Sequence, residues 1–490
     1  MILPKATLLL LLVGCGSAGE KPGATGPHSD SGAFAESRPT DSGPTDSGPT
    51  DSAASAATPL EVNVEPGVPG TVVVVSWTTP VPATSTVEFG PSLAYGRQTP
   101  RGEALVTDHR VMVVGLPASC ACFLRAVSVA VDGTLFRSAD VSYTTPEGPA
   151  GLTFTNELAR AGSGEPPWVL ALAAARGSVA IVDGDGALIW WRELPEGAGL
   201  EQARVSEDRL YVYYNQLSGL ATDPTSSTVT KLRLDGAEEH VVPTPHGHHD
   251  FLLPGGENIA YIQADIRGYD LEGDGVIEAV VGDAIQVVGP DGASLAQVWN
   301  SWDSLTVGGA RETPYFPGAW DWLHVNGLWE ADGDWYVSSH MLAAILKIDG
   351  STGAILWQLG GDDSDFVFLD GTPRFSHQHS PRILGDRLIL FNNTDGEGDP
   401  PASYAVEYQV DEAARTVREV RRHERDTPTW SSILGNVDVM TDGSWLVGWG
   451  TASVAERVAA DGTVLRVLRA AGGARISNVH EAAGLGGPLP

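Results

Sequence analysis

The chain has 490 residues, of which 42% are hydrophobic, and its 62 acidic and 30 basic side chains give a formal net charge of −32. This hydrophobic content excludes a largely disordered chain, and the length suffices for more than one domain. Such a negative charge repels phosphate backbones and anionic lipid headgroups, which disfavours nucleic-acid binding and membrane docking through basic residues. The 58 glycines, 33 prolines and 14 tryptophans are typical of a turn-rich, all-β chain.

Residues 1–15 have the layout of a secretory signal peptide, with Lys5 followed by an apolar run that is shorter than the about 20 residues needed to span a bilayer. The segment ends in Leu-Val-Gly-Cys, which resembles the lipobox of bacterial lipoproteins. This resemblance implies a diacylglycerol on Cys15 and a lipid-anchored protein of the bacterial cell envelope, on the outer membrane or facing the periplasm in a Gram-negative host. The alternative is an ordinary signal peptide that contains a cysteine.

Residues 16–57 contain a five-residue Pro-Thr-Asp-Ser-Gly repeat that runs from Pro39 to Ser52. This segment has almost no apolar side chains to bury, so it cannot offset the loss of chain entropy on folding. The composition predicts a disordered, solvated tether.

Residues 58–146 alternate between apolar and polar positions in short segments separated by turns, the pattern of a β-sandwich, with Trp77 on an early strand. This part resembles a fibronectin type III domain and is expected to be a spacer or a docking module. Cys120 and Cys122 lie two positions apart, where a disulfide is expected to be strained and where two further metal ligands are lacking. A buried thiol pair is the favoured interpretation, and the bond remains the alternative.

Residues 150–490 repeat a different unit, in which a strand, an Asp-Gly or Thr-Gly turn and a second strand often end in Trp. Thirteen of the 14 tryptophans and 11 Asp-Gly dipeptides fall here. Asp-Gly suits tight hairpins, and recurrence of such units without helical periodicity indicates a β-propeller. Roughly five to seven blades fit the length, and six are favoured.

Ten of the twelve histidines lie between His240 and His480. Four of them, His249, His324, His340 and His379, stand in segments that begin strand-rich stretches, and the innermost strands of a propeller meet at a central channel. Converging imidazoles can serve as nucleophile, general acid or base, or metal ligands. Metal binding is the weaker interpretation because only Asp250 and Asp321 adjoin these residues. In a purely structural alternative, each histidine hydrogen-bonds a loop between blades.

The order and spacing of several motifs between residues 150 and 450 resemble the bacterial arylsulfotransferases. The motifs are His248-His249-Asp250 before Pro-Gly-Gly, His324-x-Asn326, Ser338-Ser339, Thr352 to Gly361, Gln378-His379 before Leu390 to Asn393, and Gly435-Asn436-Val437. The resemblance implies a six-bladed propeller that moves sulfate from a phenolic ester to another phenol through a sulfated histidine, without a nucleotide donor.

The resemblance also implies roles for individual residues. His379 would be the nucleophile, and His249 and His324 would bind the sulfuryl oxygens and the leaving phenol oxygen. Substrate contacts are expected from Asn326, Gln378, Trp322 and Arg374. Trp320, Trp322 and Phe375 could stack on an aryl ring, but packing inside a blade is the favoured interpretation for each of them. The expected partners are small aryl sulfates and phenols, with no required cofactor and an oligomeric state left open.

The chain departs from the family at His340, where the family carries an Arg after Ser-Ser. An imidazole is largely neutral at pH 7, so loss of a permanent cation would cost a few kcal/mol of transition-state stabilisation. Arg374 and Arg382 are candidate replacements. Two rival functions follow: a non-catalytic propeller that binds a ligand or protein, and a metal-dependent hydrolase that uses the same histidines.

A separate motif places Asp270, Glu272, Asp274 and Glu278 at positions 1, 3, 5 and 9 of a loop with Gly275 at position 6. Acidic side chains at alternating positions converge on a hard cation, so this loop is a candidate structural calcium site. Glu replaces the commoner Asp at two of these positions, which weakens the match, and a solvated acidic hairpin is the favoured interpretation.

Overall fold

The computed structural model describes residues 60–160, 165–174, 176–217, 224–308 and 318–489. The predicted signal peptide, the lipidation site Cys15 and the tether 16–57 lie outside the described residues. Within them the chain is all-β, as predicted, with helical structure limited to α1 (Ser301–Ser304), η1 (Pro224–Ser226) and η2 (Ala471–Gly473). No helix in this part of the chain is long and apolar enough to cross a bilayer.

The N-terminal strands form two sheets that share one long strand, β2 (Val73–Gly90). Its first half pairs with β1 (Val62–Pro66) and β4 (Gly102–Val113). Its second half pairs with β3 (Arg97–Gln98) and β5 (Ala121–Val129), and β5 also pairs with β6 (Leu135–Arg137) and β7 (Val141–Thr144). Alternate side chains of the strands meet in one core that contains Val75, Trp77, Phe89 and Leu124. The fibronectin-like topology itself stays a prediction.

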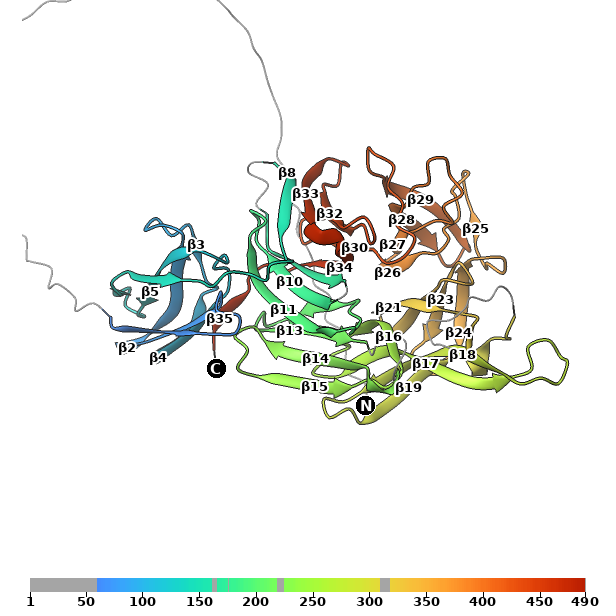
Figure 1. Cartoon of the computed structure of the whole chain (residues 1–490), viewed down its shortest axis with the longest axis horizontal. Helices are drawn as coiled ribbons and strands as arrows, with labels where there is room; N and C mark the ends of the chain where they lie inside the picture. The colour runs from blue at the N-terminus through green and yellow to red at the C-terminus, as the bar shows by residue number, and fades with distance from the viewer. Residues whose placement is uncertain (1–59, 161–164, 175, 218–223, 309–317, 490) are drawn as a thin grey trace, which may run out of the picture. The chain divides into compact units, whose positions relative to one another are not determined.

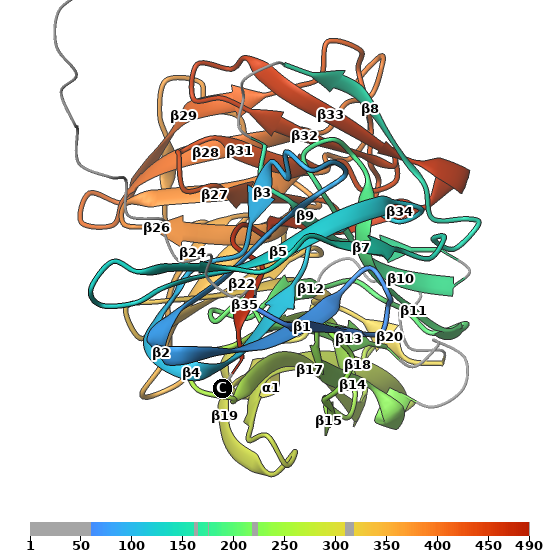
Figure 2. The same ribbon diagram turned by 90° about the vertical axis from the view of Figure 1, so that its left-hand side faces the viewer.

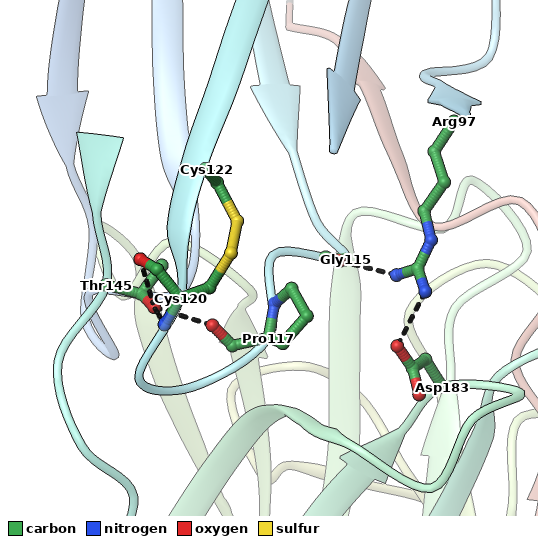
Figure 3. Close-up of a disulfide and its surroundings, with 7 residues drawn as sticks. All are labelled: Arg97, Gly115, Pro117, Cys120, Cys122, Thr145 and Asp183. Carbon is green, nitrogen blue, oxygen red and sulfur yellow. Dashed lines mark hydrogen bonds and ion pairs between the residues drawn. A yellow bond between two sulfur atoms is a disulfide. The ribbon is translucent and has the colours of Figure 1, made fainter. Parts of the chain in front are cut away.

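Cys120 and Cys122 form a disulfide, drawn in Figure 3, so the prediction of a buried thiol pair is wrong. Cys120 follows a turn in which Ser119 has a φ of 58°, and its backbone exchanges hydrogen bonds with Thr145. The two Cα atoms are therefore 5.5 Å apart, within the range that a disulfide spans. The prediction failed because it assumed a regular strand on both sides of Ala121.

Six further sheets of four or five strands make up the propeller in the described residues, which agrees with the predicted blade number. Blade 1 contains β34 (Arg475–Glu481), β9 (Trp168–Ala173), β10 (Arg176–Val182) and β11 (Leu188–Glu196). Blade 2 contains β12 (Ala203–Val205), β13 (Tyr211–Gln216), β14 (Thr228–Arg233) and β15 (Glu239–Pro243). Blade 3 contains β16 (Gly247–Leu252), β17 (Ile259–Tyr269), β18 (Glu278–Val288), β19 (Ser294–Asn300) and the short β20 (Trp320–Asp321).

The other three blades follow in chain order. Blade 4 contains β21 (Val325–Ala331), β22 (Asp334–Ser339), β23 (Ala344–Asp349) and β24 (Ile355–Gly360). Blade 5 contains β26 (His379–Leu384), β27 (Arg387–Asn392), β28 (Tyr404–Asp411), β29 (Thr416–His423) and the short β25 (Val367–Phe368). Blade 6 contains β30 (Asn436–Val439), β31 (Trp445–Gly448), β32 (Val454–Val458), β33 (Val464–Ala470) and β8 (Phe154–Ala159).

The propeller ring is closed in two blades, and in each of them a strand from the N-terminal part of the chain pairs with a strand from the C-terminal part. C-terminal β34 pairs with β9 in blade 1, and N-terminal β8 pairs with β33 in blade 6, where both views show the two strands side by side (Figures 1 and 2). The last strand, β35 (Gly486–Pro488), returns to pair with β4. Because both closures join distant segments, the blades cannot separate without breaking a sheet.

The residues that predicted the repeats serve the packing of the blades. The blade-closing Trp190, Trp299 and Trp357 are buried in the hydrophobic cores. The glycine of the Asp291-Gly292 turn between β18 and β19 has a φ of 77°, a conformation that glycine adopts without strain. With blade faces buried in this way, the first strands β16, β21, β26, β30 and β34 contact one another in sequence at the centre.

Candidate active site

Three neighbouring first strands carry histidines at the same end, and each strand is irregular there. The pairing register shifts just after His248 in β16, after Val325 in β21 and after His379 in β26. A non-glycine residue next to each shift has a left-handed backbone, with φ of 51° at His249, 49° at His324 and 53° at Ser380. Bulges re-aim side chains, and strained backbone of this kind concentrates at functional sites.

The irregular strands bring five imidazole rings into a continuous row that crosses blades 3, 4 and 5. Neighbouring ring centroids are 5.1 Å apart for His248 and His249, 4.9 Å for His249 and His324, 5.2 Å for His324 and His340, and 4.3 Å for His340 and His377. The structure thus places three of the predicted histidines together. His377 was not predicted, although it lies within the Phe375–Arg382 segment that the sequence singled out.

His379 lies beside this row and is held in one tautomer. Its Nδ1 is 2.7 Å from Asn393 Oδ1 and 3.2 Å from the His377 carbonyl, and both partners can only accept a hydrogen bond. The orientation of the Asn393 amide is fixed because its nitrogen donates to the carbonyls of Ser431 and Leu434. Nδ1 therefore carries the proton, and Nε2 presents its lone pair, which accepts a long 3.3 Å bond from the Leu434 N–H.

Burial keeps His379 neutral. It lowers the pKa of His379 to about 3, and the charges of His340 and His324 act in the same direction, whereas the hydrogen bond that His379 donates to Asn393 raises it. A neutral imidazole with a lone pair on Nε2 is the form that acts as a nucleophile.

His324 is oriented by a carboxylate. Its Nδ1 lies 3.0 Å from Asp321 Oδ2, and its backbone N–H donates to the other Asp321 oxygen at 2.9 Å. Burial alone would raise the pKa of Asp321, but the hydrogen bond and the charge of His324, with the charge of His248, lower it. An ionised carboxylate at Nδ1 favours a protonated His324 and leaves Nε2 as the atom that exchanges a proton.

A second carboxylate supports the other end of the row. His248 Nε2 lies 2.9 Å from Asp283 Oδ1, and His248 Nδ1 lies 2.8 Å from Nδ1 of His249, so one of the two Nδ1 atoms carries a proton. Burial lowers the pKa of His249 well below its usual value, and the charges of His324 and His248 lower it further. His249 is therefore a neutral hydrogen-bonding group in the site.

Asn326 and Gln378, predicted to contact substrate, are buried and brace the backbone instead. Asn326 Nδ2 donates to the Gln378 carbonyl at 2.8 Å, and Gln378 Nε2 donates to Ser338 Oγ and to the Ser339 carbonyl, both at 3.0 Å. Together these bonds fix the start of β26 against blade 4. In this structure the two amides position His379.

Neither candidate replacement for the missing Arg approaches His379. Arg374 donates to the Gly361 carbonyl and lies over the Phe368 ring. Arg382 pairs with Asp438, and His480 Nδ1 lies 3.1 Å from the same carboxyl group. Burial raises the pKa of Asp438, but the charges of Arg382 and His480 outweigh this effect and lower it.

These paired charges fill the channel beneath the histidines. Arg204 pairs with Asp250 at 3.3 Å, and Gln202 donates to the same Asp250 oxygen at 2.7 Å and contacts His480 at 3.1 Å. The space left among these side chains is about 10 Å³, too small for an aryl sulfate. The channel is therefore plugged on one side of the site.

The aromatic candidates belong mainly to the blades. Trp322 and Phe375 are each only 2% exposed and pack in hydrophobic cores. Trp320, at the start of β20, is 37% exposed. Stacking of any of these rings on an aryl substrate stays a prediction.

The candidate calcium loop lies between β17 and β18. Both carboxylate oxygens of Asp270 accept backbone N–H groups of the loop, from Asp274 at 3.0 Å and Gly275 at 2.9 Å. Among the described residues, no group of three or more His, Cys, Asp or Glu side chains is arranged to hold a metal ion. Calcium binding by Asp270, Glu272, Asp274 and Glu278 stays a prediction.

Comparison with known proteins bears directly on this histidine site. A family model described as arylsulfotransferase (ASST) matches residues 140–470. No curated protein matches the chain. Among solved structures, the chain is similar to a protein of unknown function from Bacteroides caccae (13% identity, covering 64% of this chain and 98% of that one, TM-score 0.40). It is also similar to a chain of a nidogen/laminin complex (9%, 65% and 99%, TM-score 0.39) and to apo AztD from Citrobacter koseri (14%, 66% and 99%, TM-score 0.32).

The structural similarities are too distant to bear on function. The family model is different, because it spans well over half of the chain and includes the histidine row, His379 and all the motifs up to Asn436. The chain therefore belongs to the arylsulfotransferase (ASST) family.

Proposed function

We propose that the protein transfers a sulfuryl group from a phenolic sulfate ester to a phenol, with His379 as the nucleophile. The observation that carries this proposal is the state of His379: a neutral, buried imidazole whose proton is held on Nδ1 by Asn393, so that the lone pair is on Nε2. Family membership supports sulfuryl transfer in general, and the tautomer supports this particular nucleophile.

In the first half-reaction, Nε2 of His379 attacks the sulfur of the donor and the bond between sulfur and the aryl oxygen breaks. The leaving phenolate takes a proton from Nε2 of His324, whose protonated form Asp321 favours. In the second half-reaction, the acceptor phenol returns a proton to His324 as its oxygen attacks sulfur and the bond between sulfur and Nε2 breaks. With His248 Nδ1 donating to His249 Nδ1, the neutral His249 carries its proton on Nε2, which donates a hydrogen bond to a sulfuryl oxygen in both steps.

Access to Nε2 requires one local change. The Leu434 N–H points at the same lone pair across 3.3 Å, so the turn before β30 must release this long bond as sulfur approaches. Leu434 has a left-handed φ of 64°, and a strained turn is a plausible place for such a shift.

The rest of the chain fits an envelope enzyme. We propose that a lipid on Cys15 anchors the protein to the bacterial cell envelope, that residues 16–57 act as a tether, and that the two N-terminal sheets form a fibronectin type III-like spacer or docking domain. The reaction needs no cofactor, and a calcium ion at Asp270 would be structural.

The test is turnover of 4-nitrophenyl sulfate by the full chain, with and without phenol, followed as nitrophenolate release. The His379→Asn variant is expected to lose acceptor-dependent release. The matched control is His240→Asn, because His240 lies exposed on β15 and its Nε2 contacts the Pro290 carbonyl, outside the histidine row. Equal turnover in wild type and a folded His379→Asn protein refutes the proposal. No turnover at any pH in a folded wild type favours the rival function, a non-catalytic propeller that binds a ligand or protein.

A further inference from the structure

The closest ring pair in the histidine row is formed by His340 and His377. Their centroids are 4.3 Å apart and their planes differ by 20°, so the rings are stacked. His340 lies in the turn after β22, where its N–H donates to the His324 carbonyl at 3.1 Å. His377 has a left-handed φ of 53°, and its Nδ1 lies 3.1 Å from the Thr394 carbonyl. Backbone contacts thus hold both partners of the pair.

The chemistry of this stack favours one shared positive charge. Because the Thr394 carbonyl can only accept, Nδ1 of His377 carries a proton and Nε2 is the atom that can take a second one. A protonated imidazole is attracted to the face of a neutral aromatic ring, whereas two protonated rings at this distance repel each other. The pair can therefore hold one extra proton much more readily than two.

The surroundings direct that proton to the pair. Among the residues that the structure describes, the titratable groups near it include His324, whose ring centroid is 5.2 Å from that of His340, and the buried His249 and His379. A charge on His340 lowers the pKa of both His249 and His379, in addition to the larger effect of burial. His340 and His377 are only partly buried, so charging them costs less desolvation than charging His379. The nucleophile stays neutral while the stack carries the charge.

We propose that the His340–His377 stack, loaded with one proton, binds the sulfuryl oxygens of the donor, so that an aryl sulfate monoanion binds together with a proton. This inference rests on the proposed function and extends it to His377, a residue to which no role was assigned above. The stack supplies a cation only in its protonated state, and donor binding weakens as the pH rises.

Equilibrium binding of inorganic sulfate to the full chain, measured by calorimetry between about pH 6 and about pH 8, tests the stack without relying on turnover. If sulfate binds together with one proton, its affinity should fall by up to about tenfold per pH unit once the pH is high enough for the stack to lose that proton. His377→Asn is the informative variant, because Asn tolerates a left-handed backbone and keeps a donor for the Thr394 carbonyl. It should fold with an unchanged unfolding midpoint and lose the pH dependence of sulfate binding.

His340→Arg supplies a permanent cation and should bind sulfate with little dependence on pH, while His240→Asn should behave as wild type. Sulfate binding that is undetectable, that does not vary with pH, or that keeps its pH dependence in a folded His377→Asn protein overturns the inference. The proposed function fails separately: proton-linked sulfate binding without any nitrophenolate release removes sulfuryl transfer and leaves an anion-binding stack. Turnover combined with pH-independent sulfate binding keeps sulfuryl transfer and removes the proton-loaded stack.

Discussion

Replacing Asn393 with Ala tests whether one buried amide holds the nucleophile in its reactive form. The Asn393 side chain makes three hydrogen bonds: it accepts from His379 Nδ1 at 2.7 Å and donates to the carbonyls of Ser431 and Leu434 at 2.7 Å and 2.9 Å. In Asn393→Ala, the Nδ1 proton keeps only the His377 carbonyl at 3.2 Å, and the buried Leu434 carbonyl loses its donor, whereas the Ser431 carbonyl keeps the Ser403 hydroxyl at 3.3 Å. Both stability and catalysis are expected to suffer.

The size of the stability loss follows from the Leu434 carbonyl. A buried carbonyl left without a donor costs about 1–3 kcal/mol, so the variant should lose about 1–3 kcal/mol of unfolding free energy. Urea denaturation followed by tryptophan fluorescence measures this loss. Nitrophenolate release, measured where the variant is folded, should fall by about two orders of magnitude or more because the His379 ring is no longer held.

Asn393→Asp separates orientation from charge. The carboxylate still accepts from His379 Nδ1, but it favours the protonated imidazole and raises the pKa of His379. A protonated His379 has no lone pair on Nε2, so activity should be low at neutral pH and recover as the pH rises. A folded Asn393→Ala protein with wild-type rate and stability would refute the role given to this amide.

Two further predictions concern the fold around the site. In Asp438→Asn, Arg382 stays buried without its carboxylate, so unfolding free energy should fall by about 3–5 kcal/mol. The folded protein lowers the pKa of Asp438, so the stabilisation by this carboxylate is complete above its unfolded pKa of about 4 and is lost as the pH falls below that value. Below about pH 4, the denaturation midpoint of the wild type should therefore drop more steeply with pH than that of the variant. Gly435 has a φ of 98°, and the Cβ added in Gly435→Ala would lie 2.6 Å from the Phe391 ring. The control is Gly443→Ala, because Gly443 has a similar φ of 80° but its added Cβ meets nothing within 4 Å. Thermal unfolding should show a clearly larger loss at Gly435, and equal losses would contradict the packing described.

The sequence predicts the blade architecture well because its signals are local. Asp-Gly turns and blade-closing tryptophans each act within one hairpin, and their recurrence implies blades that bury their faces against one another. The convergence of His249, His324 and His340 follows from the same logic, because they belong to neighbouring blades and two of them stand where a first strand begins.

The details of the site depend on contacts between blades, which local patterns do not encode. The register shifts at His249 and Ser380 interrupt the regular alternation of the first strands, Gln378 is a buried brace, and Arg374 donates to the Gly361 carbonyl. The pairing of Arg382 with Asp438 joins blades 5 and 6. No spacing rule identifies such a pair from one sequence.

The most direct test of the central claim is to trap the covalent intermediate. The full chain is mixed with 4-nitrophenyl sulfate in the absence of an acceptor, quenched in alkali, digested and analysed by mass spectrometry. We expect one sulfuryl group on the peptide that contains His379, absent from His379→Asn and discharged when phenol is added before the quench. Nitrophenolate release with no modified histidine, or with the sulfuryl group on another residue, would contradict it.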